Sequence, residues 1–342
     1  MESKLASAMK PLAILATMVV VFAGMKATAF IVGPFVLALL FVAVLKPVHG
    51  AMLKKKFPRL ISFLLTTILF ILILVFIGWV LSMAISQTIS IGQEYGPEVT
   101  QKIDSIAAQL DSISLISRGS SGLLKSVDAT AISNFLTGFI GAMSDIIGRL
   151  ILIFLLFMFI LAGGPLIMSS MRDKFGETHP FPRKTRAYVE NLSRYFVLRT
   201  LVNAITGLGI GLACVLLGIP NAFLWALLTF VLSYIPYIGM FIACVPPGLL
   251  SFAIGGLELL TIFILICLIV NGLAEQIVAP IVTGRGLSIS PMLVFVSFLF
   301  WGWLLGSFGY IVAVPMTLAV MLFLNSFEDT AGLASLFSNI PD

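Results

Sequence analysis

Uncharged stretches of different lengths divide the chain and predict how it is organised. No charged side chain occurs in residues 27–45, 60–93, 150–171, 200–257, 259–274 or 286–327. A helix that spans the hydrocarbon core of a membrane needs about 20 predominantly apolar residues. The pattern therefore predicts an all-α, polytopic membrane protein.

The composition points the same way. Of the 342 residues, 60% are hydrophobic and 10% are charged, and the mean hydropathy is +1.14. A soluble domain carries about 25% charged residues, so we expect this chain to be surrounded by a lipid bilayer. The net charge of +5 is small and scattered, which argues against a nucleic-acid partner. The three cysteines lie in apolar stretches, as small buried side chains do.

The distribution of charge predicts the orientation in the membrane. Residues 46–59 carry five basic and no acidic side chains, and residues 172–199 carry seven basic and three acidic ones. Residues 86–149 instead carry four basic and six acidic side chains. Because Lys and Arg accumulate in cytoplasmic loops, the first two segments are expected inside and the third outside. Both termini are then cytoplasmic.

The outer segment is expected to form an extracytoplasmic helical hairpin over residues 86–148. Apolar residues recur at heptad-like spacings in two runs, 99–113 and 132–150, with a Gly- and Ser-rich turn between them. The expected organisation around it is three membrane helices in 1–85, a fourth in 149–171, a basic cytoplasmic segment in 172–199, a second membrane half in 200–327 and a cytoplasmic tail in 328–342. The hairpin arms either pack only on each other or join subunits.

The second half contains two broken helical units, around 222–255 and 291–325. The first is interrupted between Ser233 and Gly239, and its first piece is too short to cross a membrane. The expected hinges or breaks of the second are Gly302, Gly306, Gly309 and Pro315. Each unit is either a re-entrant hairpin or a broken single span, and the pattern leaves both open.

Broken apolar segments in matching positions indicate a transport site. A break frees backbone N–H and C=O groups that hydrocarbon cannot satisfy, so it must line protein or a watery cavity. A faint repeat joins the two units, because the segment from Gly239 to Pro246 resembles the segment from Gly309 to Pro315. An ordinary kink without a ligand is the alternative.

Glu275 is the strongest single candidate for function. It is the one acid well inside an apolar run, where an ionisable group is costly and usually functional. Asn271 lies four residues earlier and therefore on the same helical face. Arg285 is a counter-ion, an interfacial anchor or a substrate ligand, and Glu275 itself could serve only a structural pairing.

The sequence motifs do not support an enzymatic function. The chain has no Gly-Lys-Ser/Thr phosphate-binding motif, and its two histidines, His49 and His179, are isolated in loops. The segment Gly119-Ser-Ser-Gly122 lies on the predicted outer side, opposite both histidines, so a Ser–His pair is excluded there. We expect no catalytic residue, no cofactor and no metal site.

Several sequence blocks carry a family resemblance. They are Ser233-Tyr-Ile-Pro-Tyr-Ile-Gly239, Pro280-Ile-Val-Thr-Gly-Arg-Gly-Leu287, Phe300-Trp-Gly-Trp-Leu-Leu-Gly306 and Val314-Pro-Met-Thr317, with Gly33-Pro34-Phe35 and Lys46-Pro47 earlier. On these blocks the chain resembles the autoinducer-2 exporter family of bacterial membrane transporters over nearly its whole length. The family pattern often has Asn where this chain has Ser233.

The resemblance implies a secondary transporter of the bacterial inner membrane with eight membrane segments that self-associates as a homo-oligomer. It implies export of a quorum-sensing signal in some members and exchange of sodium or lithium for protons in others. Cation exchange would need a carboxylate such as Glu275. A small polar solute would need hydrogen-bonding groups, for which the candidate residues are Ser233, Tyr234, Pro236, Tyr237, Gly239, Asn271, Glu275, Gln276, Pro280 and Arg285.

With one acid in the membrane, the sequence favours the polar-solute exporter, working by alternating access of the broken units against a frame of residues 12–85 and 149–217. The alternatives are a sodium(lithium)/proton antiporter and a membrane scaffold that transports nothing.

Overall fold

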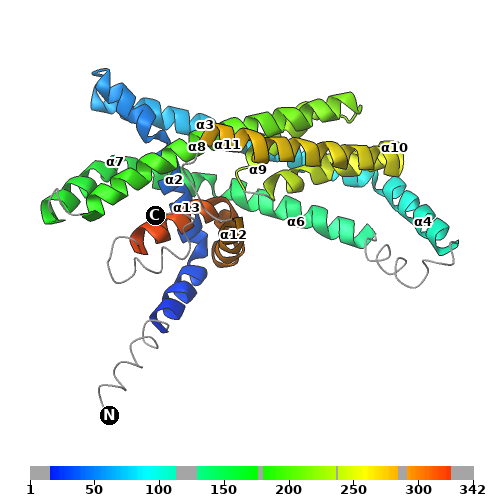
Figure 1. The fold of residues 1–342 in the computed structure, drawn as a ribbon, viewed down its shortest axis with the longest axis horizontal. Helices are drawn as coiled ribbons and strands as arrows, with labels where there is room; N and C mark the ends of the chain where they lie inside the picture. The colour runs from blue at the N-terminus through cyan, green and yellow to red at the C-terminus, as the bar shows by residue number, and fades with distance from the viewer. Residues whose placement is uncertain (1–15, 113–128, 176–179, 236–237, 284–290, 325–342) are drawn as a thin grey trace, which may run out of the picture. The chain divides into compact units, whose positions relative to one another are not determined.

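The computed structural model describes residues 16–112, 129–175, 180–235, 238–283 and 291–324 (Figure 1). The helices that follow the first described residues are α2 (Ala29–Lys54), α3 (Arg59–Glu94), α4 (Gly96–Ser112), α6 (Ala129–Gly148), α7 (Leu150–Phe175), α8 (Pro180–Leu216), α9 (Ala222–Leu232), α10 (Gly239–Gly272), the π-helix η1 (Leu273–Val278), α11 (Ala279–Thr283), α12 (Pro291–Leu305) and α13 (Ser307–Leu324). Helices satisfy their backbone hydrogen bonds internally, which is what a lipid environment demands.

Among the described residues, five helical stretches are long and apolar enough to cross a membrane. They are Ala29–Lys54, Arg59–Glu94, Ser133–Gly164, Ala187–Leu216 and Gly239–Ile281. Shorter apolar helices cover Ala16–Ala27, Ala222–Leu232, Met292–Leu305 and Ser307–Met321. The expectation of an all-α, polytopic membrane protein is confirmed.

The chain forms two compact units, each containing one of the broken segments. The first unit holds residues 1–67, 151–193 and 288–342, and the second holds residues 68–150 and 194–287. Helices α3 and α8 contribute to both units. This division differs from the expected frame of residues 12–85 and 149–217, because the boundary falls inside the helices of that frame.

In the first unit, α12 and α13 pack against α2. The chain turns between α12 and α13 at Gly306, whose φ of +67° suits glycine because it has no Cβ. Gly33 of α2 lies against Phe308, so closely that an added Cβ would be 3.0 Å from the Phe308 Cβ. The hydroxyl of Tyr188, on the first part of α8, donates to the carbonyl of Pro315 at 2.6 Å.

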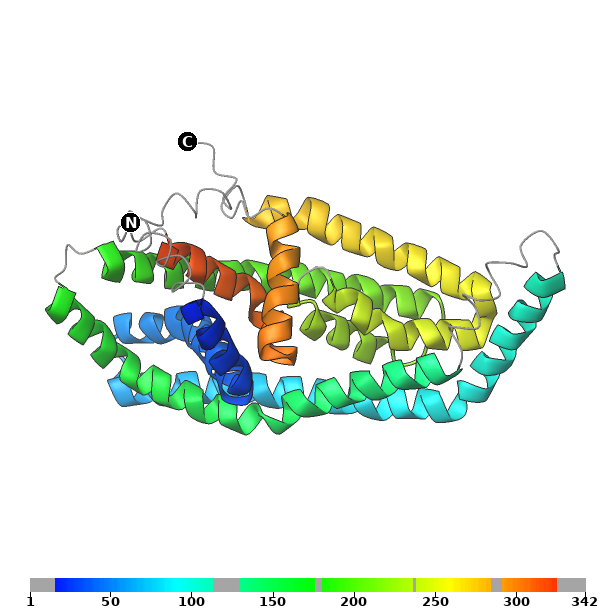
Figure 2. The ribbon, with the colours of Figure 1, turned by 90° about the horizontal axis from the view of Figure 1, so that it is seen from below.

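In the second unit, α10 folds back on itself. Gly256 has φ +67° and ψ −155°, which is outside the helical region, and it divides α10 into two arms. Figure 2 shows the arms side by side. The first arm begins at Gly239, which packs so tightly against the carbonyl of Leu232 that a side chain cannot fit there. The core between these helices includes Trp225, Leu228 and Phe263.

Helix α4 packs against the fold-back of α10. Val99, Ile103 and Ile106 contact the apolar cluster of Phe252 and Ala253. The ammonium group of Lys102 donates to the carbonyls of Ala253 and Phe252, the latter at 3.4 Å. A cation therefore lies at the C-terminal end of the first arm, where the helix dipole favours positive charge.

The heptad pattern left open whether the apolar seams at 99–113 and 132–150 pack on each other or join subunits, and in the described residues each seam contacts another helix of the same chain. The seam of α4 faces α10, as just described. Phe139 and Met143 of α6 instead join the core with Val80, Leu81 and Ala84 of α3. The residues that link α4 to α6 lie outside the described part of the chain. A periodic apolar face therefore identified buried positions, but not the partner that buries them.

Candidate functional site

Arg199 on α8 is the centre of a buried polar cluster in the second unit. The residue is 9% exposed, on the face of α8 that carries the buried Asn203 and Thr206. In the sequence, Arg199 is only the charge that precedes the uncharged run of residues 200–257. A charge at such a boundary is usually interfacial, and only the tertiary structure shows that this one points inward.

Glu275 is the partner of Arg199. Nη1 of Arg199 lies 2.8 Å from Oε1 and donates to Oε2 at 3.0 Å. The side chains are 10% and 18% exposed, so both charges are largely removed from solvent. An ion pair of this kind is retained only where the geometry satisfies both partners, because desolvation of each ion is expensive.

A local irregularity of the helix presents Glu275. Residues Leu273–Val278 form a π-helix, and the N–H of Ala279 bonds to the carbonyl of Ala274 five residues earlier. Pro280 explains the widening, because in a regular α-helix its ring clashes with the carbonyl four residues before it, here that of Gln276. π-Bulges occur frequently at functional sites. The widened turn reorients Glu275 relative to the second arm of α10.

Arg199 also holds the end of α9. Its Nη2 donates to the carbonyl of Ser233 at 2.9 Å, and Ser233 is the C-cap residue of α9. The last carbonyls of a helix have no intrahelical donor and carry partial negative charge. One guanidinium thus satisfies the broken end of α9 and the carboxylate of η1 together.

Tyr234 lies next to this cluster. Its hydroxyl is 2.6 Å from the Thr200 Oγ1, and its ring stacks on Phe196 at a centroid distance of 6.2 Å. Phe230 meets the same ring edge-on at 5.9 Å. These contacts fix Tyr234 between α8 and α9, immediately after the residue that Arg199 binds.

The structure therefore brings together Ser233, Tyr234 and Glu275 of the residues expected to form the site. Asn271 is half-buried at the end of α10, whereas Gln276 and Pro280 are exposed on η1 and α11. Gly239 starts α10 and allows the close approach to α9. The remaining candidates Pro236, Tyr237 and Arg285 lie outside the described residues.

The residues expected to break the helical segment at 291–325 have distinct structural roles. Gly306 separates α12 from α13. Gly302 lies inside α12 and leaves room for the ring of Tyr310, and Gly309 lies inside α13 against the carbonyl of Trp301. Pro315 is within α13 and receives the Tyr188 hydroxyl at its carbonyl. They belong to the first compact unit, and the Arg199 cluster belongs to the second.

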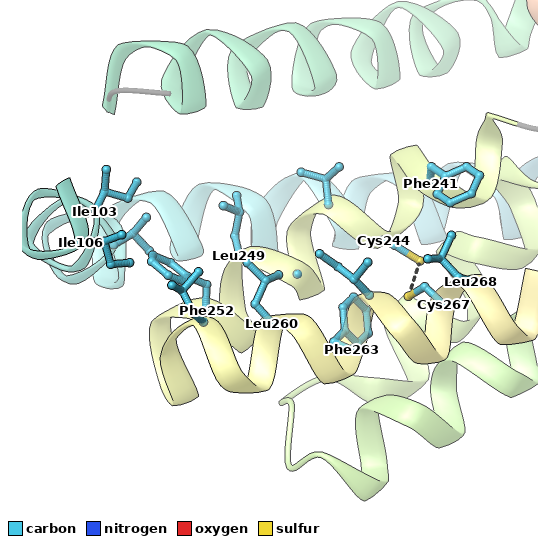
Figure 3. A pocket seen from close by; sticks show the side chains of 15 residues that line it. Ile103, Ile106, Phe241, Cys244, Leu249, Phe252, Leu260, Phe263, Cys267 and Leu268 are labelled. Carbon is cyan, nitrogen blue, oxygen red and sulfur yellow. Dashed lines mark hydrogen bonds between the residues drawn. The ribbon is translucent and has the colours of Figure 1, made fainter. Parts of the chain in front are cut away.

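An apolar cavity of about 590 Å³ lies elsewhere in the second unit (Figure 3). Its walls come from α4 and both arms of α10 and include Phe252, Phe263 and the thiols of Cys244 and Cys267, whose sulfur atoms are 3.5 Å apart. This lining offers almost no hydrogen-bonding group. The cavity is therefore chemically unsuited to a polar solute, in contrast to the Arg199 cluster.

The polar cluster carries compensated charge and several hydrogen-bonding groups at the end of a broken helix. Within the described residues, no group of three or more His, Cys, Asp or Glu side chains is placed to hold a metal ion. Interrupted membrane helices with polar groups at the break are the arrangement on which secondary transporters build their sites. The fold and the cluster together define a helical membrane protein of the transporter class.

Comparison with known proteins gives the family. Residues 15–329 match the family described as AI-2E family transporter, and the chain belongs to this family. The members of this family are transport proteins rather than enzymes. The resemblance found in the sequence is confirmed.

Named relatives align over almost the whole chain. A putative transport protein of Haemophilus influenzae is 28% identical, covering 96% of this chain and 96% of the relative. The AI-2 transport protein TqsA of Escherichia coli is 27% identical, covering 96% and 94% of the two chains. The putative transport protein YhhT of E. coli is 27% identical, covering 94% and 92%.

Proposed function

We propose that this protein is a secondary transporter that exports a small, neutral, polar solute of the autoinducer-2 type across the bacterial inner membrane. The name of the relative TqsA supports the solute class. The observation that carries the proposal is the pairing of Glu275 with Arg199. Because the two charges compensate each other, the cluster suits a solute without net charge that forms hydrogen bonds.

The same pairing argues against the sodium(lithium)/proton antiporter. A carboxylate that exchanges a metal ion for a proton must offer its oxygens to the ion. Both oxygens of Glu275 already face the guanidinium of Arg199 at 2.8 and 3.0 Å. A cation would have to displace an arginine that is effectively always charged, and the two positive charges would repel each other.

Alternating access is the mechanism that fits the break positions best. Each broken segment lies in its own compact unit, and α8 passes from the first unit to the second between Ser193 and Arg194. Arg199 follows this crossing by little more than one helical turn. A change in this part of α8 would therefore alter how Arg199 holds Ser233 and Glu275.

The topology proposed for this function places both termini in the cytoplasm and the segment containing α4 and α6 outside, as the charge distribution predicts. The homo-oligomer implied by the family resemblance belongs to the same proposal. Cross-linking of single cysteines introduced into the exposed face of α4, for example at Asp104, would detect subunits that meet there in the bilayer.

Flux through proteoliposomes tests the function. Autoinducer-2 efflux and proton-coupled sodium flux would be measured for the wild type, for Glu275→Gln and for Glu258→Gln, which alters an exposed acid on α10, the helix that precedes η1. We expect autoinducer-2 efflux in the wild type, reduced but retained in Glu275→Gln because the amide oxygen still accepts from Arg199, and unchanged in Glu258→Gln.

Two results would contradict the proposal. Proton-coupled sodium flux without autoinducer-2 efflux, abolished by Glu275→Gln, would establish the antiporter. Absence of flux for every solute tested would favour a membrane scaffold.

A further inference from the structure

Some buried polar side-chain atoms near the cluster have no hydrogen-bond partner among the described residues. Asn203 on α8 is fully buried, and neither its Nδ2 nor its Oδ1 meets a partner among the described residues. The Oγ of Ser233, which is 3% exposed, is likewise without a partner in that part of the chain. Buried polar side-chain atoms usually have at least one partner, so these exceptions need an explanation.

The contacts of α8 place Asn203 at the level of the break after α9. One turn earlier, Arg199 binds Ser233 and Glu275. One turn later, Gly207 lies against α9, where an added Cβ would be 2.6 Å from the carbonyl oxygen of Ala226. Residues four apart on a helix share a face, so Asn203 faces the same interface between these two contacts.

The second arm of α10 also packs against this part of α8. Gly209 of α8 lies against Val270, with an added Cβ 2.8 Å from its Cγ1. Arg199 reaches Glu275 five residues further along the chain from Val270. Asn203 therefore lies on α8 between these contacts, on the face that meets α9 and one turn from the Arg199–Glu275 pair.

The neighbouring Thr206 shows that burial on α8 does not by itself leave a group unpaired. Thr206 is 3% exposed, and its hydroxyl donates to the carbonyl of Val202 at 3.0 Å. A hydroxyl can thus be satisfied within the helix, whereas neither polar atom of the Asn203 amide meets a partner in the described part of the chain. In a membrane protein such groups are rare, costly and associated with a substrate path.

We propose that Asn203 is a substrate-binding residue that selects neutral solutes carrying a hydroxyl group next to a second oxygen. A primary amide offers N–H donors and a carbonyl acceptor side by side. Its Oδ1 accepts from the hydroxyl of the solute, its Nδ2 donates to the adjacent hydroxyl, carbonyl or ether oxygen, and the Ser233 hydroxyl completes the contact. This inference rests on the proposed function and adds the residue that recognises the solute.

The experiment compares stability with affinity in Asn203→Leu. Replacement of unpaired polar atoms by an apolar group of similar size is neutral or stabilising, whereas a solute that binds them loses two hydrogen bonds. We expect the melting temperature of the purified protein to stay the same or rise, while the dissociation constant for autoinducer-2 increases at least about tenfold. Ser233→Ala keeps the carbonyl that Arg199 binds and should also weaken binding.

Thr206→Val is the matched control, because it removes a buried polar group from the same helix that is already satisfied within the protein. It should leave autoinducer-2 affinity within about twofold of the wild type. Weakened binding in Asn203→Leu and Ser233→Ala, with Thr206→Val unaffected, supports the inference.

Asn203→Leu overturns the inference if it binds autoinducer-2 as the wild type does. It also overturns the inference if it and Asn203→Ala both fail to fold, because the amide is then structural. These results leave the proposed function intact when the wild type binds and transports. A wild type that neither binds nor transports autoinducer-2 overturns both.

Discussion

The guanidinium of Arg199 and the carboxylate of Glu275 form a buried ion pair, with Nη1 2.8 Å from Oε1 and 3.0 Å from Oε2. Arg199 also donates to the carbonyl of Ser233 at the broken end of α9. Three segments that are far apart in the sequence are thus joined by one side chain. The site depends on this link because it fixes both the break and the π-helix that carries Glu275.

Loss of the arginine from this pair should destabilise the protein strongly. Arg199→Met leaves a buried carboxylate without its counter-ion, and we expect a loss of about 3–5 kcal/mol in the free energy of unfolding. The double variant with Glu275→Leu should recover most of this loss, since apolar replacement of both partners is often neutral. Unfolding by SDS in mixed micelles measures both quantities.

The pair of Arg149 with Asp145 provides the control for that experiment. These side chains are 30% and 38% exposed, with Nη2 2.6 Å from Oδ1. Because an exposed pair contributes about 0–1 kcal/mol, Asp145→Asn should change stability little. Equal losses in Arg199→Met and Asp145→Asn would show that burial of the first pair has no energetic consequence.

Gly239 and Gly309 should not tolerate a side chain. Each lies near the start of the second helix of a broken unit, against a carbonyl of the preceding helix, that of Leu232 or of Trp301. We expect Gly239→Ala and Gly309→Ala each to lose at least about 1–3 kcal/mol, the usual cost of overpacking. Gly50→Ala is the control, since an added Cβ there meets nothing within 4 Å. Wild-type thermal stability in either variant would contradict the tight helix contacts.

Lys102 should stabilise the C-terminal end of the first arm of α10 against local unfolding. Its ammonium group donates to the carbonyls of Ala253 and Phe252. Lys102→Met removes both hydrogen bonds and the favourable charge at this helix end. We expect amide hydrogen exchange in residues 250–257 to accelerate about tenfold, corresponding to about 1.4 kcal/mol of local stability, while Asp104→Asn on the same helix has no effect.

The fold-back of α10 should be detectable with the native cysteines. The sulfur atoms of Cys244 and Cys267, on opposite arms, are 3.5 Å apart, and a small movement would bring them to bonding distance. Treatment with copper phenanthroline in air should link these two residues, as peptide mapping by mass spectrometry would show. Failure to link them in the wild type would contradict the arrangement of the arms.

Charges marked some helix ends but not others, since α2 continues past Lys46 to Lys54 and α8 runs from Pro180 through Arg199 to Leu216. Helix α3 extends from Arg59 to Glu94, and the two charged residues are the ends that the uncharged run predicts. Of the expected breaks, Gly306 lies at the turn between α12 and α13, whereas Gly302, Gly309 and Pro315 lie inside these helices. Glycine and proline mark positions where a helix can end, but packing decides whether it does.

Only some residues of the candidate site could be predicted from the sequence, because contacts between distant segments leave no local pattern. Glu275 stood out as an acid within an apolar run, but its partner Arg199 looked like an interfacial charge. The π-helix had a signal in Pro280, which clashes with a regular helix one turn earlier. The burial of Asn203 had no signal in the sequence. An uncharged polar residue in a membrane helix does not reveal from sequence whether it has a hydrogen-bond partner.

Isothermal titration of the purified wild-type protein with autoinducer-2, with and without sodium, tests the central claim most directly. A site built on compensated charge should bind autoinducer-2 saturably, with one molecule per chain and the same affinity in sodium-free buffer. Saturable binding of sodium together with no heat from autoinducer-2 would contradict the claim.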